Sequence, residues 1–153
     1  MYFEDFTTSG PLESAERLIT EDDVMTFARL TGDFVALHTD EAFARTTRYG
    51  RRIAHGALVF SISIGLATQM NIFGDELIAF AGVDKLRFVA PVFFGDRIHV
   101  VKRLAERKEL GAAQGTVTFD SRVLNQDGKL LLAYLDRLLI KRRAVTGETP
   151  SPL

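Results

Sequence analysis

Residues 53–73 contain no Asp, Glu, Lys or Arg over 21 positions, and this run restricts the possible folds more than any other feature of the chain. An apolar helix of that length belongs either in a bilayer or in the core of a domain. Three arginines before the run and two acidic residues after it resemble the flanks of a membrane span. The run also holds His55, two serines, Thr68, Gln69 and Asn71, which is a heavy polar load for lipid. We therefore expect a helix buried in a protein core, with no membrane partner.

Capping residues predict where the helices begin and end. Thr20 is a good N-cap, Asp23 can complete a capping box, and Gly32 can end that helix in a left-handed conformation. Thr39 is the expected N-cap of a second, short helix. The long apolar helix should begin at Gly56 and continue to about position 73, a length of roughly 27 Å.

From position 77 onward the pattern changes to strands. Turn residues separate four segments rich in strand-forming residues, at 77–88, 97–108, 113–124 and 130–141. We expect a four-strand antiparallel meander that curves over the long helix, which is an α+β architecture. Residues 1–144 would form one domain, and residues 145–153, rich in Pro and Ser, a flexible tail.

The composition excludes several classes of function. The net charge is −1 and the pI is about 6.3, so the chain lacks the electrostatic footprint of a nucleic-acid-binding protein. It has no cysteine, which excludes disulfides, thiolate metal sites and a cysteine nucleophile. No two histidines have metal-ligand spacing with a third ligand, so we expect no metal. Residues 1–10 lack the features of a secretory signal, and the expected location is the cytoplasm.

The candidate site lies within residues 31–63. Asp33 belongs to a Gly-Asp turn, His38 follows five residues later, and Gly56 opens the apolar helix. An acid, an imidazole and a helix-terminal amide are the groups that move a proton beside a polarised carbonyl. Structural roles stay open, with Asp33 as a turn cap and His38 as a structural histidine. For His55 we prefer a structural role, fixing the start of the helix.

Two serines and three arginines near this stretch have ordinary interpretations. Ser61 and Ser63 lie on the apolar helix and are read as hydroxyls tolerated in a core, unless one of them contacts the loop of the site. The arginines at 48, 51 and 52 are expected on a solvated face.

The stretch TGDFVALHTDEAFARTTRYGRRIAHGAL, residues 31–58, resembles the signature of the MaoC-like dehydratases, the hot-dog-fold (R)-specific enoyl-CoA hydratases. Their pattern is Gly-Asp-x-Asn-Pro-x-His, then Asp and Ala positions, then Ile-x-His-Gly. The matching residues are Gly32, Asp33, Leu37, His38, Asp40, Ala44, Ile53, His55 and Gly56. Residues 87–100, RFVAPVFFGDRIHV, resemble the family's turn between two strands, so the likeness covers most of residues 20–142.

This resemblance implies a single hot-dog domain that adds water reversibly across a trans-2-enoyl thioester. It assigns Asp33 and His38 to water activation and proton exchange, and the Gly56 backbone N–H to the oxyanion. Substrate binding falls to Gly56 and Ala57. No cofactor is implied, because coenzyme A arrives as part of the acyl-thioester substrate. A homodimer or higher homo-oligomer, with sheets joined edge to edge, is also implied.

The chain departs from the family pattern where Val35 and Ala36 replace Asn-Pro. Loss of proline predicts a looser loop, and Val35 cannot make the hydrogen bonds of an amide. Two alternatives accompany the hydratase, and the Val35-Ala36 replacement bears on the second of them. One is a hot-dog acyl-CoA thioesterase, and the other is a non-catalytic acyl-CoA-binding or partner subunit. The same resemblance offers coenzyme A phosphates as an alternative role for the three arginines.

Overall fold

The computed structural model describes residues 1–7 and 10–143 as helices packed against an antiparallel sheet. In chain order the elements are η1 (Phe3–Asp5), β1 (Leu12–Glu13), β2 (Arg17–Leu18), α1 (Glu21–Thr31), α2 (Ala36–Thr39), α3 (Glu41–Arg45), α4 (Gly56–Gln69), η2 (Gly74–Glu76), β3 (Leu77–Phe88), β4 (Arg97–Glu109), β5 (Gln114–Asn125) and β6 (Leu130–Lys141). The flexible tail expected at 145–153 lies outside the described residues.

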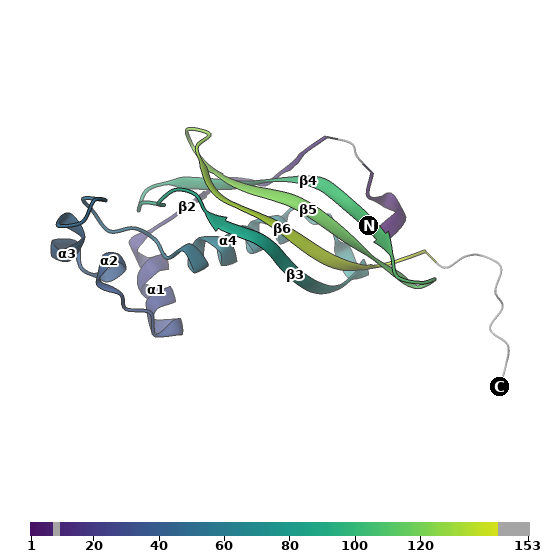
Figure 1. Ribbon diagram of the computed structural model, residues 1–153, viewed down its shortest axis with the longest axis horizontal. Helices are drawn as coiled ribbons and strands as arrows, with labels where there is room; N and C mark the ends of the chain where they lie inside the picture. Colours follow the sequence, from purple (N-terminus) through teal and green to yellow (C-terminus); the bar gives the residue numbers. More distant parts are fainter. Residues whose placement is uncertain (8–9, 144–153) are drawn as a thin grey trace.

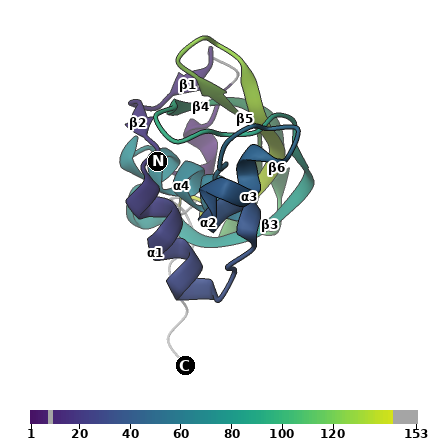
Figure 2. The same ribbon diagram turned by 90° about the vertical axis from the view of Figure 1, so that its left-hand side faces the viewer.

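The six-stranded sheet curves around α4, which lies along its inner face (Figures 1 and 2). The strand order is β1-β4-β5-β6-β3, and β2 also pairs with β4. Every described pair is antiparallel. The expected α+β architecture, a long helix wrapped by a curved antiparallel sheet, is confirmed.

The expected four-strand meander is wrong at one connection. β3 pairs with β6, where Leu77 lies opposite Ile140, and not with β4. Residues 89–96 therefore cross from one edge of the sheet to the far side of β5, and the Val89 N–H donates to the Leu131 carbonyl at 2.8 Å on the way. An eight-residue segment reaches roughly 26 Å, well beyond the ~14 Å across three strand spacings. Most hairpin loops are shorter than this segment.

Helix α4 is shorter than predicted. It ends at Gln69 with Met70 as its C-cap, and the next residue, Asn71, has a φ of 53°. Asparagine tolerates the left-handed region and can end a helix there as glycine does. The prediction missed this signal because the apolar run continues past Asn71. In the part of the chain that the structure describes, no helix combines the length and apolar character needed to cross a membrane.

The shorter helices begin at their capping residues. Thr20 Oγ1 accepts from the Asp23 N–H at 3.1 Å, and Asp23 Oδ2 accepts from the Thr20 N–H at 2.9 Å, so the predicted capping box forms. The predicted cap of the next helix is wrong by one residue. Asp40, not Thr39, caps α3 by accepting from the Phe43 N–H at 3.0 Å, and its charge favours this end of the helix dipole.

Two apolar clusters fill the space between α4 and the sheet. The first surrounds Leu58, Val59 and Leu66 of α4, and the second surrounds Phe73 and Phe119 toward the other end. Because Leu58, Val59 and Leu66 of α4 are buried, the helix supplies much of the hydrophobic stabilisation of the fold.

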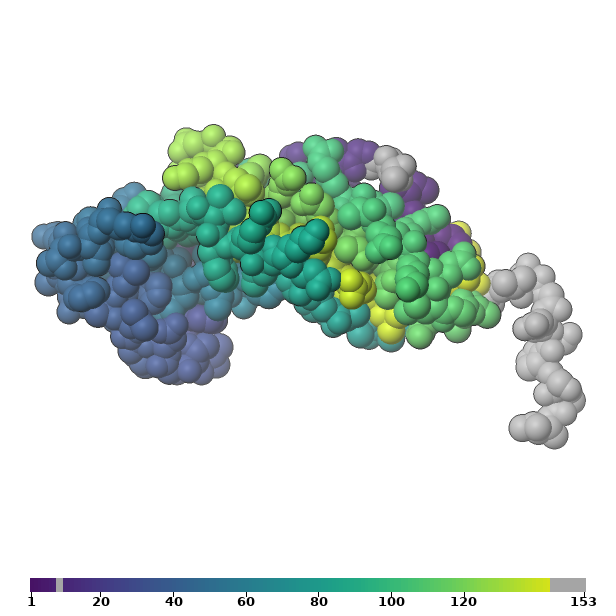
Figure 3. Space-filling view, viewed as in Figure 1, coloured from purple at the N-terminus to yellow at the C-terminus, as the bar shows by residue number. Residues whose placement is uncertain are grey.

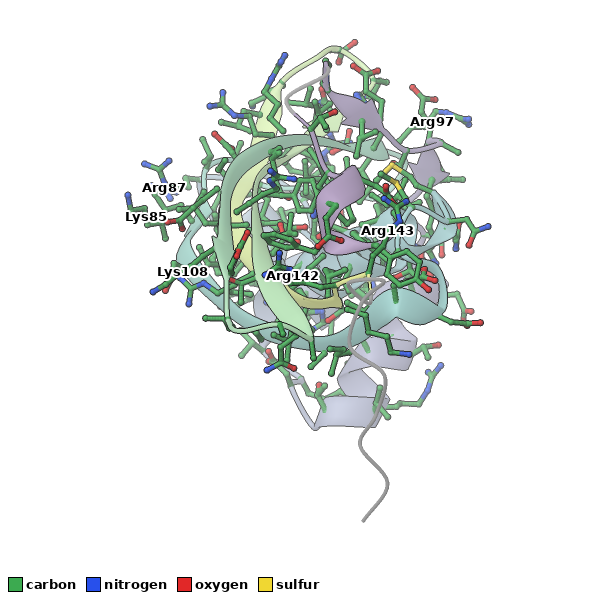
Figure 4. The ribbon with its side chains drawn as sticks, turned by 90° about the vertical axis from the view of Figure 1, so that its right-hand side faces the viewer. Lys85, Arg87, Arg97, Lys108, Arg142 and Arg143 are labelled. Carbon is green, nitrogen blue, oxygen red and sulfur yellow. The ribbon has the colours of Figure 1, made fainter. Side chains whose placement is uncertain are left out.

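The N-terminal segment closes the end of the sheet away from α1. Phe3 is buried in the second cluster. Arg142 Nε donates to Glu4 at 2.9 Å, and Arg143 Nη2 donates to Asp5 at 2.6 Å, at the end of the molecule that faces the viewer in Figure 4. These ion pairs join the end of β6 to η1.

Candidate active site

Three chemically active side chains meet at the N-terminal end of α4. Figure 3 shows α1, α2 and α3 as a lobe at one end of the sheet, and this lobe carries Asp33 and His38. His55 is the N-cap residue of α4. One oxygen or nitrogen atom from each of the three side chains lies within 4.8 Å of the others. The structure thus brings together the acid and the imidazole singled out by the sequence, and adds a second imidazole.

Asp33 lies in a loop that is closed by its own hydrogen bonds. Gly32, with a φ of 80°, turns the chain out of α1. Asp33 Oδ1 accepts from the Val35 N–H at 3.3 Å, and the Val35 carbonyl accepts from the His38 N–H at 2.9 Å. Ala36 is the first residue of α2, a position that suits proline but accepts alanine equally well. These bonds hold the loop at the position where the family pattern has proline, and the looser loop stays a prediction.

One ring nitrogen of His38 is held by the backbone. Its Nδ1 lies 2.8 Å from the carbonyl oxygen of Ile53, which can only accept. Nδ1 therefore carries the proton, and in the neutral ring Nε2 keeps a free lone pair. This orientation leaves Nε2 as the proton acceptor of the side chain.

His55 connects the loop to the helix. Its Nε2 donates to the Asp33 carbonyl at 3.0 Å, and its ring stacks on His38 with centroids 4.0 Å apart. Desolvation lowers the pKa of His55, because the side chain is buried and the positive form would lose its hydration. These contacts are those of the structural role that the sequence favoured. The direct bond to Asp33 was not foreseen, since 22 residues separate the two partners.

Gly56 is the first residue of α4 and lies tightly against Phe88. An added Cβ would come within 2.6 Å of two ring carbons of Phe88, so this position has no room for a larger residue. The first N–H groups of a helix have no acceptor within it, and the helix dipole favours negative charge at that end. The site therefore presents backbone donors next to the His38 ring.

A cavity of about 380 Å³ opens beside these residues. His38, Gly56 and Ala57 form part of its wall, and most of the remainder is apolar, including Phe88 and Leu132. The Asp33 side chain is half-buried and does not belong to the wall. An apolar hollow with few polar groups at one end suits an acyl chain with a polar head.

The three arginines before α4 have different surroundings. Arg52 is bound by two carboxylates, Glu21 at 2.7 Å and Glu41 at 3.2 Å. Arg51 lies over the ring of Phe93 at 3.9 Å. Arg48 lines the cavity together with Tyr49, whose hydroxyl accepts its hydrogen bond at 2.9 Å. Of the three, Arg48 is therefore the one in a position to meet a ligand in the cavity.

Asp33, His38 and His55 also have the composition of a metal site. The sequence argument against a metal relied on spacing along the chain, and it fails because folding brings the three together. Each histidine donates one ring N–H to a backbone carbonyl, an arrangement that metal-binding histidines share, and the two rings are tilted by 34° with centroids 4.0 Å apart. The three side chains form a hydrogen-bonded cluster whose composition also fits a metal, and the absence of a metal stays a prediction.

Comparisons with curated proteins identify relatives of this chain. Residues 4–126 match the family described as MaoC like domain. The chain is 37% identical over 129 residues to the (R)-specific enoyl-CoA hydratase of Aeromonas caviae, covering 82% of this chain and 80% of that protein. It is 38% identical over 107 residues to the 3-hydroxybutyryl-CoA dehydratase of Methylorubrum extorquens, covering 69% of this chain and 65% of that protein. It spans only 29% of the Klebsiella aerogenes protein named Protein MaoC.

Solved structures resemble this chain in fold. A protein of Archaeoglobus fulgidus, described as a monoamine oxidase regulatory protein, superposes with a TM-score of 0.89 at 39% identity, over 94% of this chain and 95% of that one. A Mycobacterium tuberculosis protein with a double hot-dog fold gives a TM-score of 0.78 at 17% identity, over 99% of this chain and 46% of that one. This is a likeness of fold alone. The family match over residues 4–126 and the relatives named as hydratases and dehydratases show that this chain belongs to the MaoC-like dehydratase family.

Proposed function

We propose that this protein is an (R)-specific enoyl-CoA hydratase, which adds water reversibly to a trans-2-enoyl thioester and dehydrates the 3-hydroxyacyl thioester in reverse. The orientation of His38 carries the proposal. Its Nδ1–H is taken by the Ile53 carbonyl, so Nε2 is the free base on a ring that lines the cavity. The relatives named as a hydratase and a dehydratase, at 37% and 38% identity, support the type of reaction.

The reaction needs a base, an acid and a site for negative charge. In the proposed mechanism Asp33 orients a water molecule, and His38 Nε2 takes its proton as the water oxygen bonds to C3 of the substrate. The electron pair of the alkene moves toward the thioester oxygen and forms an enolate. The imidazolium of His38 then returns a proton to C2, so that one water is added and no oxidant or reductant is consumed.

The negative charge of the enolate falls on the carbonyl oxygen. The Gly56 N–H is the proposed donor to this oxygen, helped by the dipole of α4. Close approach is possible because Gly56 has no side chain, and Ala57 borders the same part of the cavity. The apolar wall takes the acyl chain, and Arg48 is placed to contact the coenzyme A portion.

Variants of the two proposed catalytic residues test this function. Asp33→Asn and His38→Gln keep the size and much of the hydrogen bonding of the side chains, and each is expected to lower kcat by about 10²-fold or more. His99→Gln is the matched control, because His99 lies on β4 and does not line the cavity. It is expected to retain full activity.

The assay follows loss of the enoyl group and release of thiol in parallel. A hydratase removes the alkene without releasing thiol, whereas a thioesterase releases thiol with the alkene intact. Full hydratase activity in both Asp33→Asn and His38→Gln would contradict the mechanism. Binding of acyl-CoA without turnover would identify the non-catalytic alternative.

We further propose a homodimer formed through β3. β3 is an edge strand of the sheet, and large apolar side chains on it and just beyond it are 37–58% exposed, namely Ile78, Phe80, Leu86, Phe88 and Val89. An exposed apolar edge strand is a surface that proteins normally cover. Sedimentation equilibrium should give the mass of a dimer, and Phe80→Glu should give a monomer. A monomeric wild-type protein would refute this assembly.

A further inference from the structure

A row of polar side chains crosses the buried face of the sheet, where apolar residues are expected. Lys102 on β4, Ser121 on β5 and Asp136 on β6 are each 0–1% exposed. Along β4, the inward neighbours of Lys102 are apolar: Val100 belongs to the first cluster and Leu104 packs on the second. The polar row therefore separates the two clusters beneath the middle of the sheet.

The three side chains satisfy one another. Lys102 Nζ donates to Ser121 Oγ at 2.8 Å and to Asp136 Oδ2 at 2.6 Å. Ser121 in turn donates to Asp136 Oδ1 at 2.5 Å. Each member of such a buried group keeps its hydrogen bonds in only one arrangement of the three side chains. The group therefore holds this part of the sheet rigidly.

Tyr134 links this part of the sheet to helix α4. It lies directly opposite Ser121 in the β5–β6 pairing, and its hydroxyl is 2.9 Å from Ser63 Oγ of α4. Ser63 donates its own proton to the Phe60 carbonyl at 2.6 Å, so Tyr134 is the donor to Ser63. Burial raises the pKa of Tyr134 to about 12, which keeps this donor protonated. Among the described residues, this is the hydrogen bond that joins a side chain of α4 to a side chain of the sheet.

This bond adds a directional contact to the apolar packing of helix α4. Hydrophobic burial has no direction, so the packing of Leu58, Val59 and Leu66 restrains small rotations or slides of the helix less sharply than a hydrogen bond does. Any such movement would separate Ser63 from Tyr134 and break a buried hydrogen bond. The polar contact therefore selects one placement of the helix.

The same placement fixes the proposed oxyanion donor. Ser63 follows Gly56 by seven residues, which is two helical turns, about 10.5 Å, along nearly the same face. We propose that the hydrogen bond from Tyr134 to Ser63, backed by the Lys102–Ser121–Asp136 group, positions the Gly56 amide by fixing the rotation and axial position of α4. The kinetic consequence rests on the proposed hydratase function, whereas the placement of Gly56 does not.

Ser63→Ala, Tyr134→Phe and the double variant test this positioning role. Tyr134→Phe keeps the ring packed on Phe60, at 5.1 Å between centroids, and is expected to fold. The ¹H–¹⁵N amide resonance of Gly56 is measured in each labelled protein, together with kcat and KM. Val117→Ala is the control, because Val117 is buried in the second cluster and makes no contact with this hydrogen bond.

The amide resonance of Gly56 should move in both single variants and stay in place in Val117→Ala. Each single variant should lower kcat about tenfold with a smaller change in KM, and the double variant should be no worse than either, because all three lack the same bond. An unmoved Gly56 resonance in both single variants would overturn the inference. If the wild type hydrates no enoyl thioester, the proposed function fails, and the amide resonance still decides the positioning role.

Discussion

Gly56→Ala is the substitution for which the structure sets the sharpest expectation. The added Cβ would lie 2.6 Å from Cδ1 and Cε1 of Phe88, whereas ordinary contacts begin at 3.4 Å. Either the Phe88 ring or the start of α4 must therefore move by roughly 0.8 Å, the difference between these distances. Phe88 is 58% exposed in the single chain, so part of the strain can be relieved by movement of its ring, and the proposed dimer interface would restrict that movement.

The displacement should affect catalysis more than stability. Misplacing an orienting group by about 1 Å lowers a rate by up to ~10²-fold, equivalent to about 2.7 kcal/mol. We expect Gly56→Ala to lower kcat/KM on a trans-2-enoyl-CoA by about 10- to 100-fold, mainly through kcat, because an oxyanion donor acts on the transition state. The free energy of unfolding should fall by only about 1–2 kcal/mol, as for moderate overpacking.

A second substitution separates the clash from other effects. Phe88→Ala removes the ring, so the Gly56→Ala/Phe88→Ala double variant should recover the kcat of Phe88→Ala alone. Steady-state kinetics and urea unfolding of the four proteins complete the cycle. The reasoning would be refuted if Gly56→Ala kept the wild-type kcat/KM, or if the double variant were no more active than Gly56→Ala.

Two further predictions concern buried ionisable groups. Desolvation lowers the pKa of His55 in the folded protein. Between this lowered pKa and the ordinary pKa of ~6.5, the unfolded chain therefore binds more protons than the folded one. The free energy of unfolding should rise with pH across this range and fall as the pH is lowered through it. Urea unfolding between pH 5 and about 7.5 should show a flatter slope in His55→Gln, and an unchanged slope would exclude His55 as its source. Lys102→Met leaves the charge of Asp136 buried and unpaired, so it should lower the free energy of unfolding by about 3–5 kcal/mol. Lys102→Met/Asp136→Leu should regain most of that loss, and equal instability of the single and double variants would contradict the explanation.

Local signals in the sequence predicted the ends of most elements. The capping box of Thr20 and Asp23 forms as expected, and Gly32 takes the expected left-handed conformation. The four long strands lie within one residue of their predicted bounds, because turn residues mark each end. The late end predicted for α4 shows the limit of such signals, since Asn71 interrupts an apolar pattern that continues to Phe73.

Contacts between residues far apart in the chain could not be predicted from the sequence. The chain gives no local sign that β3 pairs with β6, because strand partners are chosen by the fold and not by neighbouring residues. The contact of His55 with Asp33 was hidden for the same reason. The inward-facing Lys102 interrupts the alternation along β4, and this was a usable sign of a buried polar group. Its partner Asp136, 34 residues away, required the structure.

The product formed from a single substrate tests the central claim most directly. Purified protein is incubated with trans-2-butenoyl-CoA, and the product is analysed by mass spectrometry and chiral separation. The account predicts a thioester that has gained one water and has the (R) configuration at C3, formed at a rate that Asp33→Asn lowers by about 10²-fold or more. Recovered butenoyl thioester, free thiol, or a product formed equally well by Asp33→Asn would contradict it.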